Sequence, residues 1–433
     1  MIAFVSAAFL ALASLADAAP RGRIGVLRST TAGGKPNSYI IALKSQDVVD
    51  SHNKWINAQV ANTNASWVAQ TYTGVTSAQG FTAYNAILDP NDPAVSMQDG
   101  SPLKNKDGSF MSILDAARAR SDIEFIEEDS VFKTTAIEDQ TNAPWGLQRV
   151  SSNAALPPGS RANTLAFDYT NDDTAGQGVD VYVIDTGVNA QHQSFEGRAV
   201  MAFAAQGLAE TDDQGHGTHC SGTIASKDFG VAKAANIFGV KVLGADGSGQ
   251  NSDILQGIAA AMQMAKQSGK PSVISMSLGG GASPSLDRAV TAATQQGMHV
   301  VVAAGNEAAD ANTSSPARAP AVITVGASNI NDQVASFSNF GQGVDIFAPG
   351  QDVISTFIGS TTAKQILSGT SMACPHVAGM VAAILSSEGQ MTPAAMATRL
   401  KGLGAQGVLK NVPRGTTNLL AQLPQAGQGA GQQ

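Results

Sequence analysis

Short apolar runs alternate with longer amphipathic runs from about residue 143 to residue 420. The short runs are rich in β-branched residues and are bounded by turn formers, which is typical of buried strands. Strands separated by helices predict βαβ units, and therefore an α/β domain with a mainly parallel sheet covered by helices on both faces. The predicted strands are residues 179–184, 237–243, 273–276, 299–303 and 322–325, and the clearest helices are residues 254–266 and 285–296.

The N-terminal part of the chain has a different pattern, in which two amphipathic stretches separate three apolar ones. It predicts a small α+β unit that ends in a polar stretch, residues 133–142, which we expect to be a linker without regular structure. The predicted strands are residues 39–43, 84–88 and 123–132, the helices are residues 47–60 and 111–120, and residues 91–107 form a loop.

The first residues have the features of a secretion signal. Residues 1–15 are uncharged and mostly apolar, and Ala16, Asp17 and Ala18 fit the small-residue pattern of a signal-peptidase site. The apolar run is shorter than the ~20 residues that span a bilayer, although a buried helix or a membrane anchor is an alternative. We expect residues 1–18 to be removed on secretion, and the low-complexity residues 424–433 to form a disordered tail.

Composition narrows the class of protein. Apolar residues make up 43% of the 433 residues and charged residues 14%, which suits packed domains and excludes general disorder. The net charge of −8 argues against a nucleic-acid-binding protein, which normally carries a basic stripe. Two cysteines are too few for a disulfide-rich scaffold. The length suits two domains of ~150 residues or more.

Four residues lie where an α/β domain presents functional groups. Asp185 and Asn306 each follow a predicted strand, at the end where such sheets gather their active residues. His216 lies between two glycines at the start of a small-residue run. Ser371 lies at the start of an apolar helix whose first turn can include Pro375. Asp185, Asn306 and Ser371 also have ordinary explanations, as turn or helix-capping residues.

The order Asp185, His216, Ser371 points to nucleophilic catalysis. A hydroxyl is a weak nucleophile at neutral pH, so it needs an imidazole to take its proton and a carboxylate to orient that imidazole. The amide of Asn306 can donate a hydrogen bond to a developing oxyanion.

His219 offers an alternative, a metal pair with His216. No further ligands occur at the spacings of known metal motifs, so we expect His219 to be a buried histidine with satisfied hydrogen bonds. We expect Asp212 and Asp213 to be solvated.

Three motifs in this order resemble the catalytic blocks of the subtilisin family: VIDTG at 183–187, GHGTHCS at 215–221 and GTSMACPHVAG at 369–379. Further motifs resemble its fungal proteinase K-like branch: NAPWGL at 142–147, FGVAK at 229–233 and FSNFG at 337–341. The resemblance extends from about residue 141 to residue 420. Residues 39–132 resemble the inhibitory, ferredoxin-like propeptide of these proteases, with a longer loop at 91–107.

The resemblance implies a role for each candidate. Ser371 would attack the scissile carbonyl, His216 would carry its proton to the leaving amine, and Asp185 would orient the imidazole. Asn306 and the backbone N–H of Ser371 would hold the oxyanion. The implied protein is a secreted, monomeric serine endopeptidase of broad specificity that digests proteins and peptides through an acyl-enzyme. A catalytically inactive protein-binding relative is the alternative function, and a vacuole is the alternative location.

The resemblance also implies binding sites for substrate and calcium. Glycines in two segments would let a peptide strand approach closely, although simple turns explain them as well. Because no acidic cluster marks a pocket for arginine or lysine, cleavage after apolar or aromatic residues is favoured. The expected substrate-binding residues are Gly247, Ser248, Gly249, Ser277, Leu278, Gly279 and Gly280. The expected ligands of one structural Ca²⁺ are the carbonyls of Pro320 and Val322 and the carboxylate of Asp345, a donor set that suits a hard cation.

The resemblance finally implies a self-processed zymogen. Residues 19–137 would form the propeptide, with its inhibitory domain at 38–133, and residues 138–433 the peptidase, with the cut between about Thr134 and Gln140. Cys220 would be a free, buried thiol, and a Cys220–Cys374 disulfide is the alternative. Asn64 and Asn312 fit the N-glycosylation pattern.

Overall fold

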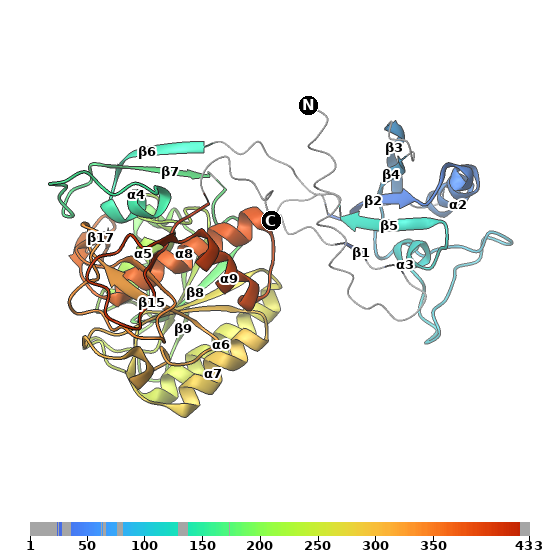
Figure 1. The fold of residues 1–433 in the computed structure, drawn as a ribbon. Coiled ribbons are helices and arrows are strands. Elements are labelled where there is room, and N and C mark those ends of the chain that lie inside the picture. The colour runs from blue at the N-terminus through green and yellow to red at the C-terminus, as the bar shows by residue number, and fades with distance from the viewer. Residues whose placement is uncertain are drawn as a thin grey trace. The chain divides into compact units, whose positions relative to one another are not determined.

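The computed structural model describes residues 24, 26–27, 36–61, 63, 66–75, 81–128, 137–172 and 174–424. The chain divides into two compact units, Met1–Lys133 and Thr134–Gln433 (Figure 1). The expected signal peptide, residues 425–433 of the expected tail and the glycosylation candidate Asn64 lie outside the described residues.

The first unit is an α+β fold, as predicted. Its sheet has the strand order β1-β5-β2-β4-β3, and the succession βαββαβ from β2 to β5 is the ferredoxin-like one. Strand β3 lies at the sheet edge, where the apolar pattern is weaker, and the prediction missed it. The elements are β1 (Val26–Leu27), β2 (Ser38–Leu43), η2 (Gln46–Val48), α2 (Val49–Val60), β3 (Trp67–Val75), β4 (Phe81–Ile87), α3 (Ile113–Arg118) and β5 (Ile123–Glu128).

The second unit is built on a nine-stranded sheet in the order β19-β20-β16-β15-β13-β11-β8-β10-β9. Every neighbouring pair is parallel except β19 with β20, and all five strands predicted from the sequence lie in this sheet. The strands are β8 (Asp180–Asp185), β9 (Ala199–Ala204), β10 (Asn236–Lys241), β11 (Ser272–Met276), β13 (His299–Ala303), β15 (Ile323–Ser328), β16 (Ile346–Pro349), β19 (Ala405–Gln406) and β20 (Leu419–Leu420).

Helices cover both faces of this sheet, which confirms the α/β prediction (Figure 1). Strand β8 lies within the sheet and alternates its side chains between two cores. Val181 and Val183 pack with residues of α5 and α8, whereas Tyr182 and Ile184 pack with residues of α6 and α7. The helices are α4 (Trp145–Ser151), α5 (His216–Ala225), α6 (Asn251–Ser268), α7 (Pro284–Gln295), α8 (Thr370–Glu388) and α9 (Pro393–Leu403).

Helix α8 passes through the core of the second unit. Among the described residues it is the one helix long and apolar enough to cross a membrane, yet 83% of its most apolar window is buried inside the protein. A core helix passes the same test of length and composition, so α8 is explained by packing.

Three short antiparallel pairs complete the second unit. Strand β6 (Ile137–Ala143) pairs with β7 (Phe167–Asp172), so the expected linker is wrong from Ile137 onward. Thr141 and Asn142 are exposed; pairing with β7 satisfies the strand's backbone although its residues are polar. The other pairs are β12 (Gly280–Gly281) with β14 (Ser314–Ser315), and β17 (Val353–Thr356) with β18 (Lys364–Leu367). Short turns of 3₁₀ helix are η3 (Gln193–Phe195) and η4 (Ala311–Thr313), where Asn312 is exposed.

The parallel strands sort the candidate residues into two groups. Asp185 ends β8, Ser277 follows β11 and Asn306 follows β13, so all three lie at the carboxyl edge of the sheet. Val322 precedes β15 and Asp345 precedes β16, so the expected calcium ligands lie at the opposite edge. The sheet therefore separates the candidate catalytic residues from the candidate metal ligands.

Candidate active site

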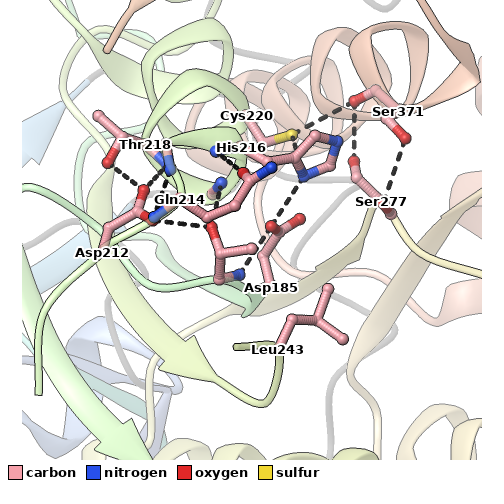
Figure 2. Close-up of polar contacts among 12 residues, drawn as sticks. Asp185, Asp212, Gln214, His216, Thr218, Cys220, Leu243, Ser277 and Ser371 are labelled. Atoms are coloured by element: carbon pink, nitrogen blue, oxygen red, sulfur yellow. Dashed lines mark hydrogen bonds and ion pairs between the residues drawn. The ribbon is translucent and has the colours of Figure 1, made fainter. Parts of the chain in front are cut away.

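His216 and Asp185 form the central pair of the site (Figure 2). His216 is the first residue of α5, and its Nδ1 lies 2.8 Å from Oδ1 of the fully buried Asp185. The carboxylate accepts, so Nδ1 carries the proton and Nε2 is left as the basic nitrogen. Burial is the largest single effect and lowers the pKa of His216, but Asp185 and Cys220 together outweigh it and raise this pKa well above 6.5.

Two glycines set the approach of α5 to the turn after β8. A Cβ on Gly217 would lie 2.2 Å from the carbonyl oxygen of Gly187, so any side chain there would push the helix away from Asp185. Gly215 has φ of +102°, and a Cβ there would lie 2.4 Å from the ring of Phe357. The glycines around His216 in the sequence are therefore needed for its contact with Asp185.

Asp212 is not solvated, contrary to the prediction. The residue is 6% exposed, and Oδ1 accepts from Thr186 Oγ1 at 2.9 Å and from the N–H groups of Gly215 and Gln214 at 2.8 and 3.1 Å. Oδ2 accepts from both the N–H and the hydroxyl of Thr218, at 2.9 and 2.5 Å. Burial raises its pKa, but these hydrogen bonds outweigh burial and hold it below the ordinary value. The sequence does carry a signal for this role, because Asp212 lies three residues before Gly215, and aspartates near a turn often accept hydrogen bonds from its backbone N–H groups.

Lys241 is a second positioning group that the sequence analysis missed. Its ammonium is fully buried and donates to the carbonyls of Thr186 and Leu243, at 2.7 and 2.9 Å. It also pairs with Asp213 Oδ1 at 2.7 Å; Asp213 is exposed, as predicted, but one of its oxygens faces this buried ammonium. Lys241 thereby joins the turn after Asp185, the loop before His216 and the strand end at Leu243.

Ser371 and Ser277 exchange hydrogen bonds (Figure 2). The Ser371 hydroxyl donates to the Ser277 carbonyl at 3.2 Å, and the Ser277 hydroxyl donates to the Ser371 carbonyl at 2.9 Å. The Cys220 thiol, at 3.4 Å, donates to the same carbonyl. Pro375 lies inside α8 rather than in its first turn, which corrects the prediction. Because Pro375 has no N–H to give the Ser371 carbonyl, Ser277 and Cys220 replace the missing helical bond.

One pocket of about 250 Å³ is lined by His216, Asn306 and Ser371 together. No hydrogen bond joins His216 to Ser371, both of which are described residues. The Asn306 Oδ1 accepts from the N–H and the hydroxyl of Thr370, at 2.8 and 2.9 Å. No acceptor among the described residues takes a hydrogen bond from Asn306 Nδ2, so this group is available for an oxygen in the pocket.

Two larger pockets adjoin Ser371 and His216 and contain every expected substrate-binding residue. The first, of about 460 Å³, is lined by Ser371 and Asn306 and by Ser277, Leu278, Gly279 and Gly280. The second, of about 410 Å³, lies between the two glycine-containing segments and is lined by His216, Gly247, Ser248, Gly249, Ser277, Leu278 and Gly279. Turn chemistry is present as well, since the Gly244 N–H donates to the Ser248 carbonyl.

His219 is buried and directed away from the pair. Its Nε2 lies 3.1 and 3.2 Å from the carbonyls of Val353 and Gln365, and burial lowers its pKa to about 3. Nδ1 has no partner among the described residues, so the ring is only half satisfied. The cluster whose ligand atoms lie within 4.8 Å of one another is instead Asp185, His216 and Cys220. In this cluster the His216 nitrogen nearest the Cys220 sulfur is Nδ1, which already bonds to Asp185.

Both cysteines are free, buried thiols, so the disulfide alternative is wrong. Burial raises the pKa of Cys374 to about 12, and it also raises the pKa of Cys220. Both thiols therefore stay protonated near neutral pH.

The expected calcium ligands include a carboxylate that is already engaged. Asp345 Oδ2 accepts from the N–H of Thr324 at 2.9 Å, and Oδ1 lies 2.7 Å from the ammonium of Lys401. Val322 is buried and Pro320 is exposed at the turn before β15. Carbonyl and carboxylate oxygens suit Ca²⁺ chemically, but one oxygen of this carboxylate faces an internal cation.

A model of the Subtilase family matches residues 176–429. The chain belongs to this family. A subtilisin-like serine protease of Penicillium rubens, Pen ch 18, is 39% identical over 428 residues, which cover 94% of this chain and 83% of that protein. A cuticle-degrading protease of Metarhizium anisopliae is 46% identical over 306 residues, covering 70% of this chain and 76% of that protein.

A solved structure agrees with these relatives. A cold-adapted subtilisin-like serine proteinase is 41% identical, has a TM-score of 0.60, and covers 65% of this chain and 99% of its own. The expected family and the expected α/β catalytic fold are confirmed. The chain is a subtilisin-like serine protease, which acts on protein substrates.

The contacts of Asp212 lead to a prediction. Asp212→Ala should lower kcat by about 10–100-fold with a smaller change in KM, because the loop that starts α5 loses the bonds that hold His216 against Asp185. Glu210→Ala removes an exposed carboxylate two residues away and should leave kcat unchanged. Steady-state hydrolysis of a chromogenic peptide, with thermal unfolding to check the fold, measures both. Equal kcat in the two variants would contradict a positioning role for Asp212.

Proposed function

We propose that the chain is a secreted endopeptidase that cuts peptide bonds through a triad of Asp185, His216 and Ser371. The observation that carries this proposal is the bond between His216 Nδ1 and Asp185, beside a pocket that His216, Ser371 and Asn306 line together. Nε2 of the same ring is the nitrogen left to accept the Ser371 proton.

The first half of the reaction follows from these positions. The Ser371 hydroxyl leaves the Ser277 carbonyl, gives its proton to His216 Nε2 and forms a bond from Oγ to the scissile carbonyl carbon. The carbonyl oxygen becomes an oxyanion, which accepts from Asn306 Nδ2 and from the N–H of Ser371. The imidazolium, stabilised by Asp185, then protonates the leaving nitrogen as the C–N bond breaks.

The second half repeats these steps with water. Water gives a proton to His216 Nε2 while its oxygen attacks the acyl carbon. The proton returns to Ser371 Oγ as the ester bond breaks, which releases the acid product and restores the enzyme.

We propose that substrates bind mainly through their backbone. The pocket of about 410 Å³ lies between the two glycine-containing segments, which suits an added peptide strand. Gly280 and Gly281 are exposed, and a Cβ on either would meet no atom within 4 Å. The neighbouring pocket of about 460 Å³ is lined mostly by small residues, with Leu278 and four alanines as its apolar part, which supports broad specificity with acceptance of apolar side chains.

One carboxylate changes the expected preference. Glu307 lines the pocket of about 460 Å³, and its Oε2 accepts from Asn339 Nδ2 at 2.7 Å. Asn339 also binds the N–H of Glu307 and the carbonyl of Ala304, so the carboxylate is held at the pocket. We propose that Glu307 adds acceptance of basic side chains.

We propose that the protein is made as a zymogen. The ferredoxin-like unit supports an inhibitory propeptide, and the apolar N-terminus supports secretion, with a vacuole as the alternative location. Strand β6 pairs with β7 from Ile137 onward, which favours a cut before Ile137, near the start of the expected window from Thr134 to Gln140, because such a cut leaves this pairing intact. We expect the mature protein to be a monomer.

We also propose one structural calcium site at the carbonyls of Pro320 and Val322 and the carboxylate of Asp345. Its oxygen donors suit Ca²⁺, which would add stability and no chemistry, since these residues lie at the edge of the sheet opposite Ser371. Lys401 now occupies one oxygen of Asp345.

Ser371→Ala tests the whole proposal. Turnover of casein should fall by about 10⁶-fold, and the intact mass of the secreted variant should still include the propeptide that wild type loses. Ser387→Ala, at an exposed serine of the same helix, should process and digest like wild type. A variant that is trimmed but inert would show maturation by another protease. A wild type that binds casein without cutting it would favour the inactive relative.

The pH profile tests the His216–Asp185 pair. The imidazole must be neutral to accept a proton, so kcat/KM should fall with decreasing pH through a pKa well above 6.5. Asp185→Asn removes the charge that raises this pKa; we expect the acidic limb to move to lower pH and kcat to drop by about 10⁴-fold. An acidic limb that does not move would contradict the pairing. Peptide hydrolysis between pH 5 and 10 measures the limb.

Substrate preference tests Glu307. Glu307→Gln should lower kcat/KM by about three- to tenfold for a peptide cut after lysine, because an attractive charge is lost at the pocket. The matched peptide cut after phenylalanine should be unaffected. The two rates, measured at low salt, decide the point: a parallel change in both would show that Glu307 acts on the fold and not on the charge of the substrate.

A further inference from the structure

Lys401 and Asp345 form an ion pair at the edge of the sheet opposite the active site. Lys401 lies in the last turn of α9, and its ammonium is 2.7 Å from Asp345 Oδ1. The lysine side chain is 50% exposed and the aspartate side chain 26% exposed, so the carboxylate is partly shielded from solvent. A cation in the last turn of a helix is also favoured by the helix dipole.

Neither side chain of the pair has a second charged partner among the described residues. Asp345 Oδ2 accepts from the N–H of Thr324, and Oδ1 faces Lys401. The other basic residue of α9, Arg399, is bound by Glu388 through three hydrogen bonds and is not free to replace Lys401. Among the described residues, Lys401 is the cation that neutralises Asp345.

A calcium ion and this ammonium repel each other at Asp345. Ca²⁺ binds carboxylate oxygens at about 2.3–2.6 Å, so an ion on Oδ1 would lie roughly 4 Å from an ammonium bonded to the same oxygen. Calcium that bound at Pro320, Val322 and Asp345 would therefore have to displace Lys401 or bind against its charge.

We propose that Lys401 is a built-in counter-ion that competes with calcium for Asp345. This inference rests on the calcium site proposed above. The lysine neutralises the carboxylate when calcium is scarce, and the cost of displacing it weakens calcium binding. Lys401 then determines how strongly stability depends on calcium, although it does not itself bind the metal.

Calcium titration tests the competition. The full chain carrying Ser371→Ala is used, so that self-digestion does not interfere, and CaCl₂ is titrated by isothermal calorimetry at low ionic strength. Lys401→Met should tighten the calcium Kd by about two- to fivefold, the range expected when a partly exposed ion pair is removed. Lys401→Arg keeps the charge and should bind calcium like the parent. Lys266→Met removes an exposed lysine elsewhere and is the matched control for net charge.

Thermal unfolding gives an independent readout. In EDTA, Lys401→Met should unfold at a lower temperature than the parent, because Asp345 has lost its counter-ion. Saturating CaCl₂ should close this gap. Asp345→Asn should abolish the calcium-dependent rise in Tm.

The outcomes separate cleanly. Tighter calcium binding by Lys401→Met than by Lys266→Met, with a lower Tm in EDTA, supports the proposal. An identical Kd in the two variants, no calcium binding by any chain, or full calcium binding by Asp345→Asn overturns it. None of these results bears on proteolysis by Ser371, which the casein experiment decides separately.

Discussion

The candidate active site depends on a hydrogen bond that helix α8 cannot make. Pro375 has no N–H, so the carbonyl of Ser371 loses its helical partner deep inside the second unit. A buried carbonyl without a partner is costly, and the hydroxyl of Ser277 and the thiol of Cys220 supply the missing donors. Ser277 follows β11, and Cys220 lies one helical turn after His216 in α5. Hydrogen bonding to the Ser371 carbonyl thereby holds the start of α8, the segment after β11 and helix α5 together around the Ser371 hydroxyl.

The parallel sheet supplies the rest of the geometry. Its strands deliver Asp185, Ser277 and Asn306 to one edge, while α5 presents His216 from the face above it. The distance from His216 to Asp185 depends on a close contact between α5 and the turn after β8. The carbonyl of Gly187 leaves no room for a side chain at Gly217. Asp212 and Lys241 then fasten the surrounding turns through buried charge-assisted bonds. Asp185, His216 and Ser371 therefore all lie on regular elements, in β8, α5 and α8.

The sequence was sufficient for elements with a local signal. The five apolar β-branched runs became strands of the large sheet. Three motifs and a strand-end asparagine picked out Asp185, His216, Ser371 and Asn306, which the structure places around one pocket. Features that depend on distant partners were missed. Lys241 is buried because its acceptors come from three separate segments. Strand β6 looks like a polar linker until β7 is placed beside it. The position of Pro375 in α8 depends likewise on where the helix begins, at Thr370, which the apolar pattern does not mark.

The exposed glycine strand β12 has a consequence for the lifetime of the protein. It pairs with β14 on one side only, and its other edge presents backbone groups and no side chains. The backbone-mediated binding proposed for substrates would not distinguish a foreign chain from a second copy of this one. Protection from self-digestion would then come from the described parts of the molecule whose backbone is already paired in sheets and helices. The lifetime of such a protease would then depend on how firmly its loops are held. A change that lets a loop adopt an extended conformation would make it a site of self-cleavage.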